Sequence, residues 1–192
     1  MSNKVGLTSS GQSKTSQTFG SSLEQPRCPD RAVLAPLMAS STDPPHFRPA
    51  RYTDLLRVAA IVHAAYTPYI ARMGQPPGPM LDDYAQRLAA GQLWVTETQG
   101  TVIGVIVLET GQDALLIDNI AIDPAAHGTG LGSLCLAFAE TEARQRGLPA
   151  LRLYTNALMT ENVAYYSRRG FVETHRATEH GYDRIYMAKP VA

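Results

Sequence analysis

The sequence predicts an α/β (α+β) fold, with a mixed sheet of six to seven strands and about four helices on its two faces. Three observations lead to this prediction. From residue 46 onward, apolar residues repeat with strand-like and helix-like spacing in turn. Two strand-like segments flank the two-residue turn Gln99-Gly100, as in a hairpin. A glycine-rich loop at 127–132 joins a strand-like segment to a helix-like one.

The first half of this region predicts two helices and four strands. Residues 47–50 form a short edge strand, and Thr53 caps a helix that ends before a loop at 68–79, where four prolines and two glycines occur. This loop is a candidate lid. Residues 81–91 read as a second helix. The hairpin strands cover 94–97 and 102–109, and a third long strand covers 115–122.

The next predicted helix has the clearest apolar face, with a spacing of i, i+3, i+4 and i+7 over Leu131, Leu134, Cys135 and Phe138. Two Glu–Arg pairs at i,i+4, 140–144 and 142–146, support it, and Gly147 and Pro149 end it. A strand follows at 151–155. Thr160 caps a short helix that ends at Gly170, and the last strands cover 171–175 and 184–188. The predicted order is therefore βααβββαβαββ.

Composition excludes several classes of protein. Seventeen basic residues balance 17 acidic ones, so the chain lacks the general positive charge of a nucleic-acid binder, although a local basic patch remains open. Its two cysteines do not form a disulfide framework and are expected as free thiols. No apolar run approaches the ~20 residues that span a membrane. We therefore expect a cytoplasmic protein with no membrane or nucleic-acid partner.

Residues 1–45 differ from the rest, because they are rich in Ser, Thr, Gln and Pro and show little periodicity. Such a segment buries too little apolar surface to offset its ordering entropy, and we expect a disordered tail before a domain at 46–192. Two alternatives remain open. The tail is a mitochondrial presequence, although no Arg precedes Arg27, or Met38 is the true start.

The first chemical motif is His127-Gly128-Thr129-Gly130-Leu131-Gly132, between a strand and a helix. Glycines let the backbone approach a ligand closely, and the helix behind them offers unpaired N–H groups and the positive end of its dipole. Together these features suit a pyrophosphate, while a purely structural turn is the alternative. No Gly-Lys-Ser/Thr follows, which excludes a Walker A loop. The next strand ends in Tyr154-Thr155-Asn156 without an acidic residue, which disfavours a dinucleotide fingerprint.

The surroundings of this loop resemble a known family. The run Ile117-Asp118-Asn119-Ile120-Ala121-Ile122-Asp123-Pro124, followed by 127–132, resembles motif A of the GNAT N-acetyltransferase superfamily. Downstream, 153–156, 159–162, Tyr166 and Gly170-Phe171 resemble its motif B region. The resemblance covers about residues 46–192. His127 departs from it, since the family usually has Arg or Gln there.

The resemblance implies a mostly antiparallel sheet that splays at a central cleft, with acetyl-CoA as co-substrate and no metal. The pantetheine arm is expected to pair with the backbone of Ile120, Ala121 and Ile122. The expected pyrophosphate contacts are His127, Gly128, Thr129, Gly130, Leu131, Gly132 and Ser133. Asn156 and Asn162 are expected to contact the CoA arm by their side-chain amides.

Tyr166 matches the family's usual general acid, which protonates the leaving thiolate. The alternative is a packed core aromatic, which is the role expected of Tyr165. Asp118 is a candidate general base, because it shares strand parity with Ile120 and Ile122 and can face the cleft. A structural Asp, with water as the base, remains open. No Cys or Ser nucleophile is implied, so we expect direct transfer in a ternary complex.

The expected acceptor is a primary amine of a small molecule or a peptide. The family places its acceptor wall at the end of the first helix and the following loop, where this chain has His63, Tyr66, Tyr69, Arg72 and Met73. Tyr66 and Tyr69 are the substrate-binding candidates, with packing as the alternative. Many family members form homodimers, so a homodimer is possible here. Two other functions remain open: a non-catalytic acyl-CoA-binding or sensing module on the same fold, and an unrelated nucleotide-binding protein.

Overall fold

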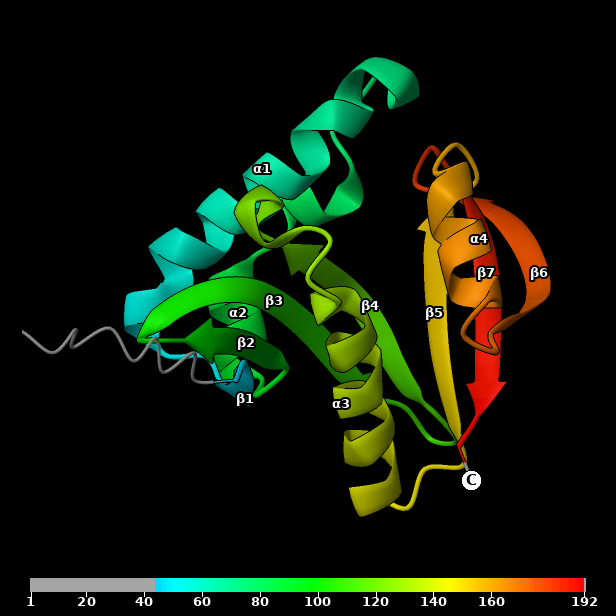
Figure 1. Cartoon of the computed structure of the whole chain (residues 1–192). Coiled ribbons are helices and arrows are strands. Elements are labelled where there is room, and N and C mark those ends of the chain that lie inside the picture. Colours follow the sequence, from blue (N-terminus) through cyan, green and yellow to red (C-terminus); the bar gives the residue numbers. More distant parts are fainter. Residues whose placement is uncertain (1–43, 192) are drawn as a thin grey trace, which may run out of the picture. The chain divides into compact units, whose positions relative to one another are not determined.

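The computed structural model describes residues 44–191, which contain one seven-stranded sheet in the order β1-β2-β3-β4-β5-β7-β6 (Figure 1). The strands are β1 (His46–Pro49), β2 (Leu93–Thr98), β3 (Thr101–Thr110), β4 (Leu115–Ile122), β5 (Ala150–Asn156), β6 (Val172–Glu179) and β7 (Tyr182–Pro190). The α-helices of this part are α1 (Leu55–Met73), α2 (Tyr84–Ala89), α3 (Leu131–Gln145) and α4 (Thr160–Ser167). Short 3-10 turns occur at Tyr52–Asp54, Gly78–Leu81 and Pro124–Ala126. The predicted fold class and element order are confirmed.

The sheet splays apart between β4 and β5 (Figure 1). These strands run parallel and pair at three positions, from Leu115 opposite Leu151 to Ile117 opposite Leu153. Every other neighbouring pair in the described sheet is antiparallel. Beyond Ile117, β4 pairs with β3 on one side, while its side towards β5 has no strand partner within residues 44–191. The backbone of Asp118–Ile122 is therefore open towards the cleft.

Two hydrophobic cores lie on opposite faces of the sheet, because the side chains of a strand alternate between faces. On β3, Val105 and Val107 belong to the core under α1 and α2, whereas Ile106 and Leu108 belong to the core under α3. The aromatic residues of α4 pack at the margin of the α3 core. Thus α1 and α2 cover one face, and α3 and α4 cover the other.

The end of the first helix lies later than expected. Helix α1 continues through Pro68 to Met73, and Gly74 ends it with a φ of 71°. The prediction of a loop from residue 68 is wrong for residues 68–73. A proline removes one helical hydrogen bond, but the Thr67 hydroxyl donates to the His63 carbonyl (2.7 Å), and Arg72 near the end of the helix pairs with Glu161. Arg72 and Met73 are thereby placed on a rigid element.

Three local predictions also need correction. Leu134 is 43% exposed, because α3 faces the sheet with small residues such as Ala139 and Ala143, which turn Leu134 outward. Thr160 is the first helical residue and not the cap; the N-cap position is Met159, without a side-chain cap bond. The second helix starts at 84 and not 81, because the Asp83 carboxylate accepts hydrogen bonds from the next amides and fixes the start there.

Cys135 is buried in α3 as a free thiol, and burial raises its pKa to about 12. Among residues 44–191, no helix is long and apolar enough to cross a membrane. The predictions for Cys28, for the presequence, for Met38 and for nearly all of the tail fall in residues 1–43, outside the described part of the chain.

Candidate active site

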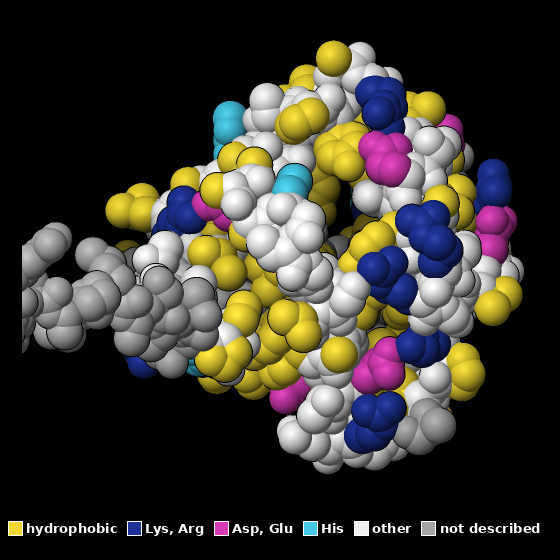
Figure 2. Space-filling model, viewed as in Figure 1, with side chains coloured by type: hydrophobic (Ala, Val, Ile, Leu, Met, Phe, Trp, Pro, Cys, Tyr) yellow, Lys and Arg dark blue, Asp and Glu magenta, His cyan; other side chains and the backbone are white. Residues whose placement is uncertain are grey.

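Two pockets meet where β4 leaves β5. The strand pocket, about 310 Å³, lies between the open part of β4, β5 and the segment 77–82. The loop pocket, about 580 Å³, lies between the open part of β4, the glycine loop and α4. Four residues line both pockets: Tyr66, Ile120, Asn162 and Tyr166. In Figure 2, a hollow with hydrophobic side chains around it opens between the two halves of the sheet.

The glycine loop has the conformation that its sequence requires. Gly128 and Gly130 have φ values of 78° and 86°, which side chains with a Cβ rarely adopt, and Gly130 is the N-cap of α3. In the first turn of α3, the Ser133 N–H donates to the Gly130 carbonyl (2.9 Å), whereas the N–H groups of Leu131 and Gly132 have no partner within the helix. Leu131, Gly132 and Ser133 all line the loop pocket. The loop backbone thus curves around the pocket wall, and the pyrophosphate site at this loop stays a prediction.

Two side chains of the loop take other roles. The Nε2 atom of His127 lies 3.2 Å from the carbonyl oxygen of Ile122, so its imidazole is directed back to the end of β4, although His127 still lines the pocket. The Thr129 hydroxyl donates to the carbonyl of Ala126 (2.8 Å) and braces the turn; Thr129 is not among the lining residues. The expected backbone segment Ile120, Ala121 and Ile122 lines the loop pocket.

Gly132 is required by a close approach of α4. A Cβ at this position would lie 2.4 Å from the Tyr165 hydroxyl oxygen. This hydroxyl is buried and has no hydrogen-bond partner within the described residues. Tyr165 therefore packs with its hydroxyl end against the first turn of α3, and the guanidinium carbon of Arg169 lies 3.5 Å from its ring centroid.

Tyr166 lies at the junction of the two pockets. Its ring packs edge-on against Phe171 and Tyr165, with centroids 5.8 and 5.4 Å away. Within residues 44–191 its hydroxyl makes no hydrogen bond, so the proton is free to be donated to a ligand. Burial raises the pKa of the Tyr166 phenol well above its usual value. The group therefore stays protonated at neutral pH, as a general acid must before it acts.

Asp118 lines the strand pocket, but both of its oxygens are engaged. Oδ2 accepts from Arg87 (3.1 Å), and Oδ1 accepts from the Tyr154 hydroxyl. Burial raises the pKa of Asp118, and these two donors oppose the increase. Arg87 also pairs with Asp82 (2.9 Å) and Glu109, so one guanidinium at the wall of the strand pocket binds three carboxylates.

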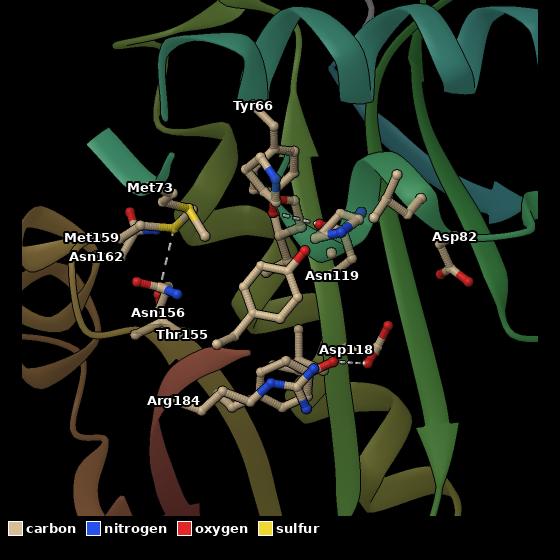
Figure 3. A pocket seen from close by; sticks show the side chains of 18 of the residues that line it. Tyr66, Met73, Asp82, Asp118, Asn119, Thr155, Asn156, Met159, Asn162 and Arg184 are labelled. Atoms are coloured by element: carbon tan, nitrogen blue, oxygen red, sulfur yellow. Dashed lines mark hydrogen bonds between the residues drawn. The ribbon is translucent and has the colours of Figure 1, made fainter. Parts of the chain in front are cut away.

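Tyr66 is the start of a hydrogen-bond chain (Figure 3). Its hydroxyl donates to Asn119 Oδ1 (2.6 Å), and Asn119 Nδ2 donates to the Tyr84 hydroxyl (2.9 Å). Tyr84 in turn donates to the Pro79 carbonyl (2.9 Å). Because the Tyr66 proton is committed to Asn119, the lone pairs of the Tyr66 oxygen remain for an N–H donor in the pocket.

The other predicted residues divide between the pockets. Asn162 lines both, with its Nδ2 3.5 Å from the Met159 sulfur (Figure 3). Asn156 lines the strand pocket and not the loop pocket, and its Oδ1 accepts from the Leu158 amide (2.9 Å). Conversely, Tyr69 lines the loop pocket and not the strand pocket.

Comparisons with known proteins assign the chain to a family. The family described as "Acetyltransferase (GNAT) family" matches residues 58–171, more than half of the chain. The chain belongs to this GNAT family. The matched region includes α1, the open part of β4, the glycine loop and α4, and therefore most of both pockets. Acetyl transfer is the activity for which the family is named.

Two of the similar proteins are named as acetyltransferases. The IAA acetyltransferase of Azospirillum brasilense is 31% identical over 101 residues, which are 50% of this chain and 66% of that protein. The mycothiol acetyltransferase of Nocardia farcinica is 43% identical over 56 residues, 29% of this chain and 18% of that protein. The chain thus spans just under two thirds of the first relative and less than a fifth of the second.

Solved GNAT structures share the fold. The ribosomal-protein-S18-alanine N-acetyltransferase from Escherichia coli aligns with a TM-score of 0.63 at 22% identity, over 77% of this chain and 94% of its own. The PaiA N-acetyltransferase from Thermoplasma acidophilum, solved in complex with coenzyme A, aligns with a TM-score of 0.64 at 17% identity, over 76% and 98%. At these identities the likeness concerns the fold.

Several lining residues were not singled out from the sequence of this GNAT protein. In the strand pocket they are Arg87, Asn119, Tyr154 and Arg184, and in the loop pocket they are Tyr165 as a wall and Arg169. The spacing of Asn162, Tyr165 and Arg169, at i, i+3 and i+7, is a signal that could have placed the last two on one face. In residues 44–191 there is no cluster of three or more His, Cys, Asp or Glu side chains suited to a metal ion.

Proposed function

We propose that this protein transfers an acetyl group from acetyl-CoA to a primary amine of a small molecule or a peptide, by direct attack in a ternary complex. The observation that carries the proposal is the junction of two pockets at the Tyr166 side chain and the open backbone of β4. One pocket has the features of an anion site, and the other has polar side chains suited to an amine. A donor and an acceptor placed in them meet at Ile120 and Tyr166.

The donor side rests on two kinds of backbone group. The free edge of Ile120, Ala121 and Ile122 supports pairing of the pantetheine amides as an added strand. The glycine loop and the start of α3 support binding of the pyrophosphate. The residues present therefore fit CoA, which supplies the activated thioester when bound. Asn162, which lines both pockets, is placed to contact the arm between them.

The acceptor side has to supply a neutral amine next to the thioester. An amine with a pKa of ~10.4 is only ~0.1% neutral near pH 7.4, a cost of about 4 kcal/mol, whereas an α-amine with a pKa near 8 has a far smaller cost. The Tyr66 oxygen supports orientation of the amine by accepting one N–H. Asp118 remains the candidate base, acting through a water molecule, since its two oxygens already hold Arg87 and Tyr154.

The proposed reaction balances as follows. The amine nitrogen forms a bond to the acetyl carbon, the C–S bond breaks, and Tyr166 gives its proton to the departing thiolate. The proton lost by the amine passes to water or to Asp118, and the Tyr166 proton is later regained from solvent. A positioned acid typically contributes ~10²–10⁴-fold to the rate.

The first test is thermal unfolding with acetyl-CoA, with NAD and ATP as controls, followed by a panel of amines. A ligand at about 100 times its Kd adds ~2.7 kcal/mol of stability, which raises Tm by several degrees. Stabilisation by acetyl-CoA together with turnover of an amine would support the proposal. Stabilisation without turnover of any amine would favour a non-catalytic acyl-CoA sensor. Stabilisation by NAD or ATP alone would overturn the donor assignment.

A further inference from the structure

Arg169 carries a positive charge that has no acidic partner within residues 44–191. Its Nη2 and Nε atoms donate to the Ser133 hydroxyl oxygen (2.8 and 3.3 Å), and its Nη1 donates to the Tyr165 carbonyl (3.1 Å). Other half-buried arginines of this chain differ: Arg48, Arg87 and Arg184 each bond at least one carboxylate. A partly buried charge is costly unless an opposite charge is present, so the surroundings of Arg169 suit an anion.

The guanidinium lines the loop pocket, together with the glycine loop and the first turn of α3. Its partner Ser133 is the third residue of α3, so the charge lies beside the first turn of this helix, at its N-terminus. Lys and Arg side chains gather over the α4 side of the hollow (Figure 2). The imidazole of His127, at the other end of the loop, is directed to Ile122. Among the described residues that line the loop pocket, Arg169 is thus the one Arg or Lys.

We infer that Arg169 binds a phosphate group of acetyl-CoA and supplies, from α4, the side-chain charge of the phosphate site. The inference rests on the proposed function, since it names a residue of the same donor site. A guanidinium has five N–H groups, and the three Arg169 bonds in the described structure use one N–H from each of its three nitrogens. Two N–H groups therefore remain for the oxygens of a phosphate, which guanidinium binds with matching geometry.

Tyr165 is the positioning residue for this charge. The guanidinium carbon lies 3.5 Å from its ring centroid, and a cation is attracted to the face of such a ring. The hydroxyl end of the same ring is wedged against Gly132. The Tyr165 ring thus contacts both the loop backbone and Arg169, and it holds the guanidinium in place beside the glycine loop.

The test is the affinity for CoA of the full chain and of three variants, measured by calorimetry. In Arg169→Gln we expect Kd to rise about tenfold or more, since one charge-assisted contact is lost. Arg169→Lys keeps a charge without the fork and should recover part of the affinity. The matched control is Arg168→Gln, because Arg168 is the exposed neighbour and lines neither pocket. The Kd of this control should change less than about twofold, as expected for an exposed charge that the solvent screens.

A second ligand, 3′-dephospho-CoA, identifies the phosphate. If Arg169 binds the 3′-phosphate, wild type and Arg169→Gln will bind this ligand equally; if it binds the pyrophosphate, the loss will be the same for both ligands. An Arg169→Gln variant that folds normally and binds CoA as wild type does would overturn the inference, and so would equal losses in Arg168→Gln and Arg169→Gln. Wild-type protein that fails to bind CoA would instead overturn the proposed function, and the inference with it.

Discussion

Arg72 near the end of α1 forms an ion pair with Glu161 in the first turn of α4, with 2.8 Å between Nη1 and Oε2. The two helices belong to opposite halves of the splayed sheet, so the pair bridges the cleft. Two further bonds reach across it: Gln75 Nε2 donates to the Gly181 carbonyl (3.0 Å), and the Tyr182 hydroxyl donates to the Pro76 carbonyl (2.7 Å). The proline-rich segment after α1 is therefore tied down beside the strand pocket.

Loss of this bridge should loosen the segment more than it destabilises the protein. Both side chains are 47% exposed, and exposed pairs contribute only ~0–1 kcal/mol. In Glu161→Gln we expect a small change in Tm but faster amide hydrogen exchange over residues 74–81. Glu173→Gln, which removes another exposed pair, within β6, is the control and should leave this exchange unchanged. Unchanged exchange in Glu161→Gln would show that the hydrogen bonds suffice.

Tyr166→Phe should lower kcat by tenfold or more and leave the affinity for acetyl-CoA nearly unchanged, because it removes the proton donor and keeps the ring packing. Steady-state kinetics and calorimetry measure the two effects separately. The control is Tyr165→Phe, which removes a neighbouring hydroxyl that has no partner in the described structure. Its kcat should stay near the wild-type value. Equal turnover in both variants would remove Tyr166 from the catalytic role.

Gly132→Ala should weaken the binding of acetyl-CoA, since the new methyl group would lie 2.4 Å from the Tyr165 hydroxyl and displace α4 from the loop. The next contact, to the ring carbon that bears the hydroxyl, is 3.3 Å and needs only a small shift. The double variant Gly132→Ala/Tyr165→Phe should therefore recover most of the affinity. A double variant as weak as Gly132→Ala would locate the defect in the loop itself.

Acid should weaken the fold through Asp54. The hydrogen bond from Arg48 (2.7 Å) is the main reason that the pKa of this buried carboxyl lies below its usual value. A lowered pKa adds stability above the unfolded pKa of about 3.9, and this is lost as the pH falls through the folded value. Asp54→Asn should therefore be less stable than wild type at pH 7, by ~1–3 kcal/mol, with a smaller difference at pH 3.

Urea unfolding at both pH values measures this difference. The control is Asp113→Asn, where the carboxylate pairs with Arg152 at an exposed position. It should change the stability little at either pH. A difference for Asp54→Asn that is the same at pH 7 and pH 3 would show that the carboxylate charge is not the cause.

Local signals predicted much of this structure. The strand at 115–122 was predicted with its observed bounds, and the glycine loop was recognised because its residues are contiguous. The pocket residues that were missed depend on long-range contacts. Arg87 and Asp118 are 31 residues apart in the sequence, and no local pattern around Arg87 predicts its three carboxylate partners. Leu134 was misplaced for a similar reason, because the sheet and not the helix pattern decides which small residues face inward.

Because β4 and β5 pair at only three positions, the rest of β4 is an exposed strand edge in the middle of the sheet when no ligand is bound. Its apolar residues Ile120 and Ile122 stand beside unpaired backbone groups, which is the combination that recruits strands from other chains during aggregation. A ligand that pairs with this edge completes the sheet while it is bound. Ligand binding in the cleft should therefore protect against aggregation as well as support activity. Protein stored with its ligand should remain monodisperse longer than protein stored without it.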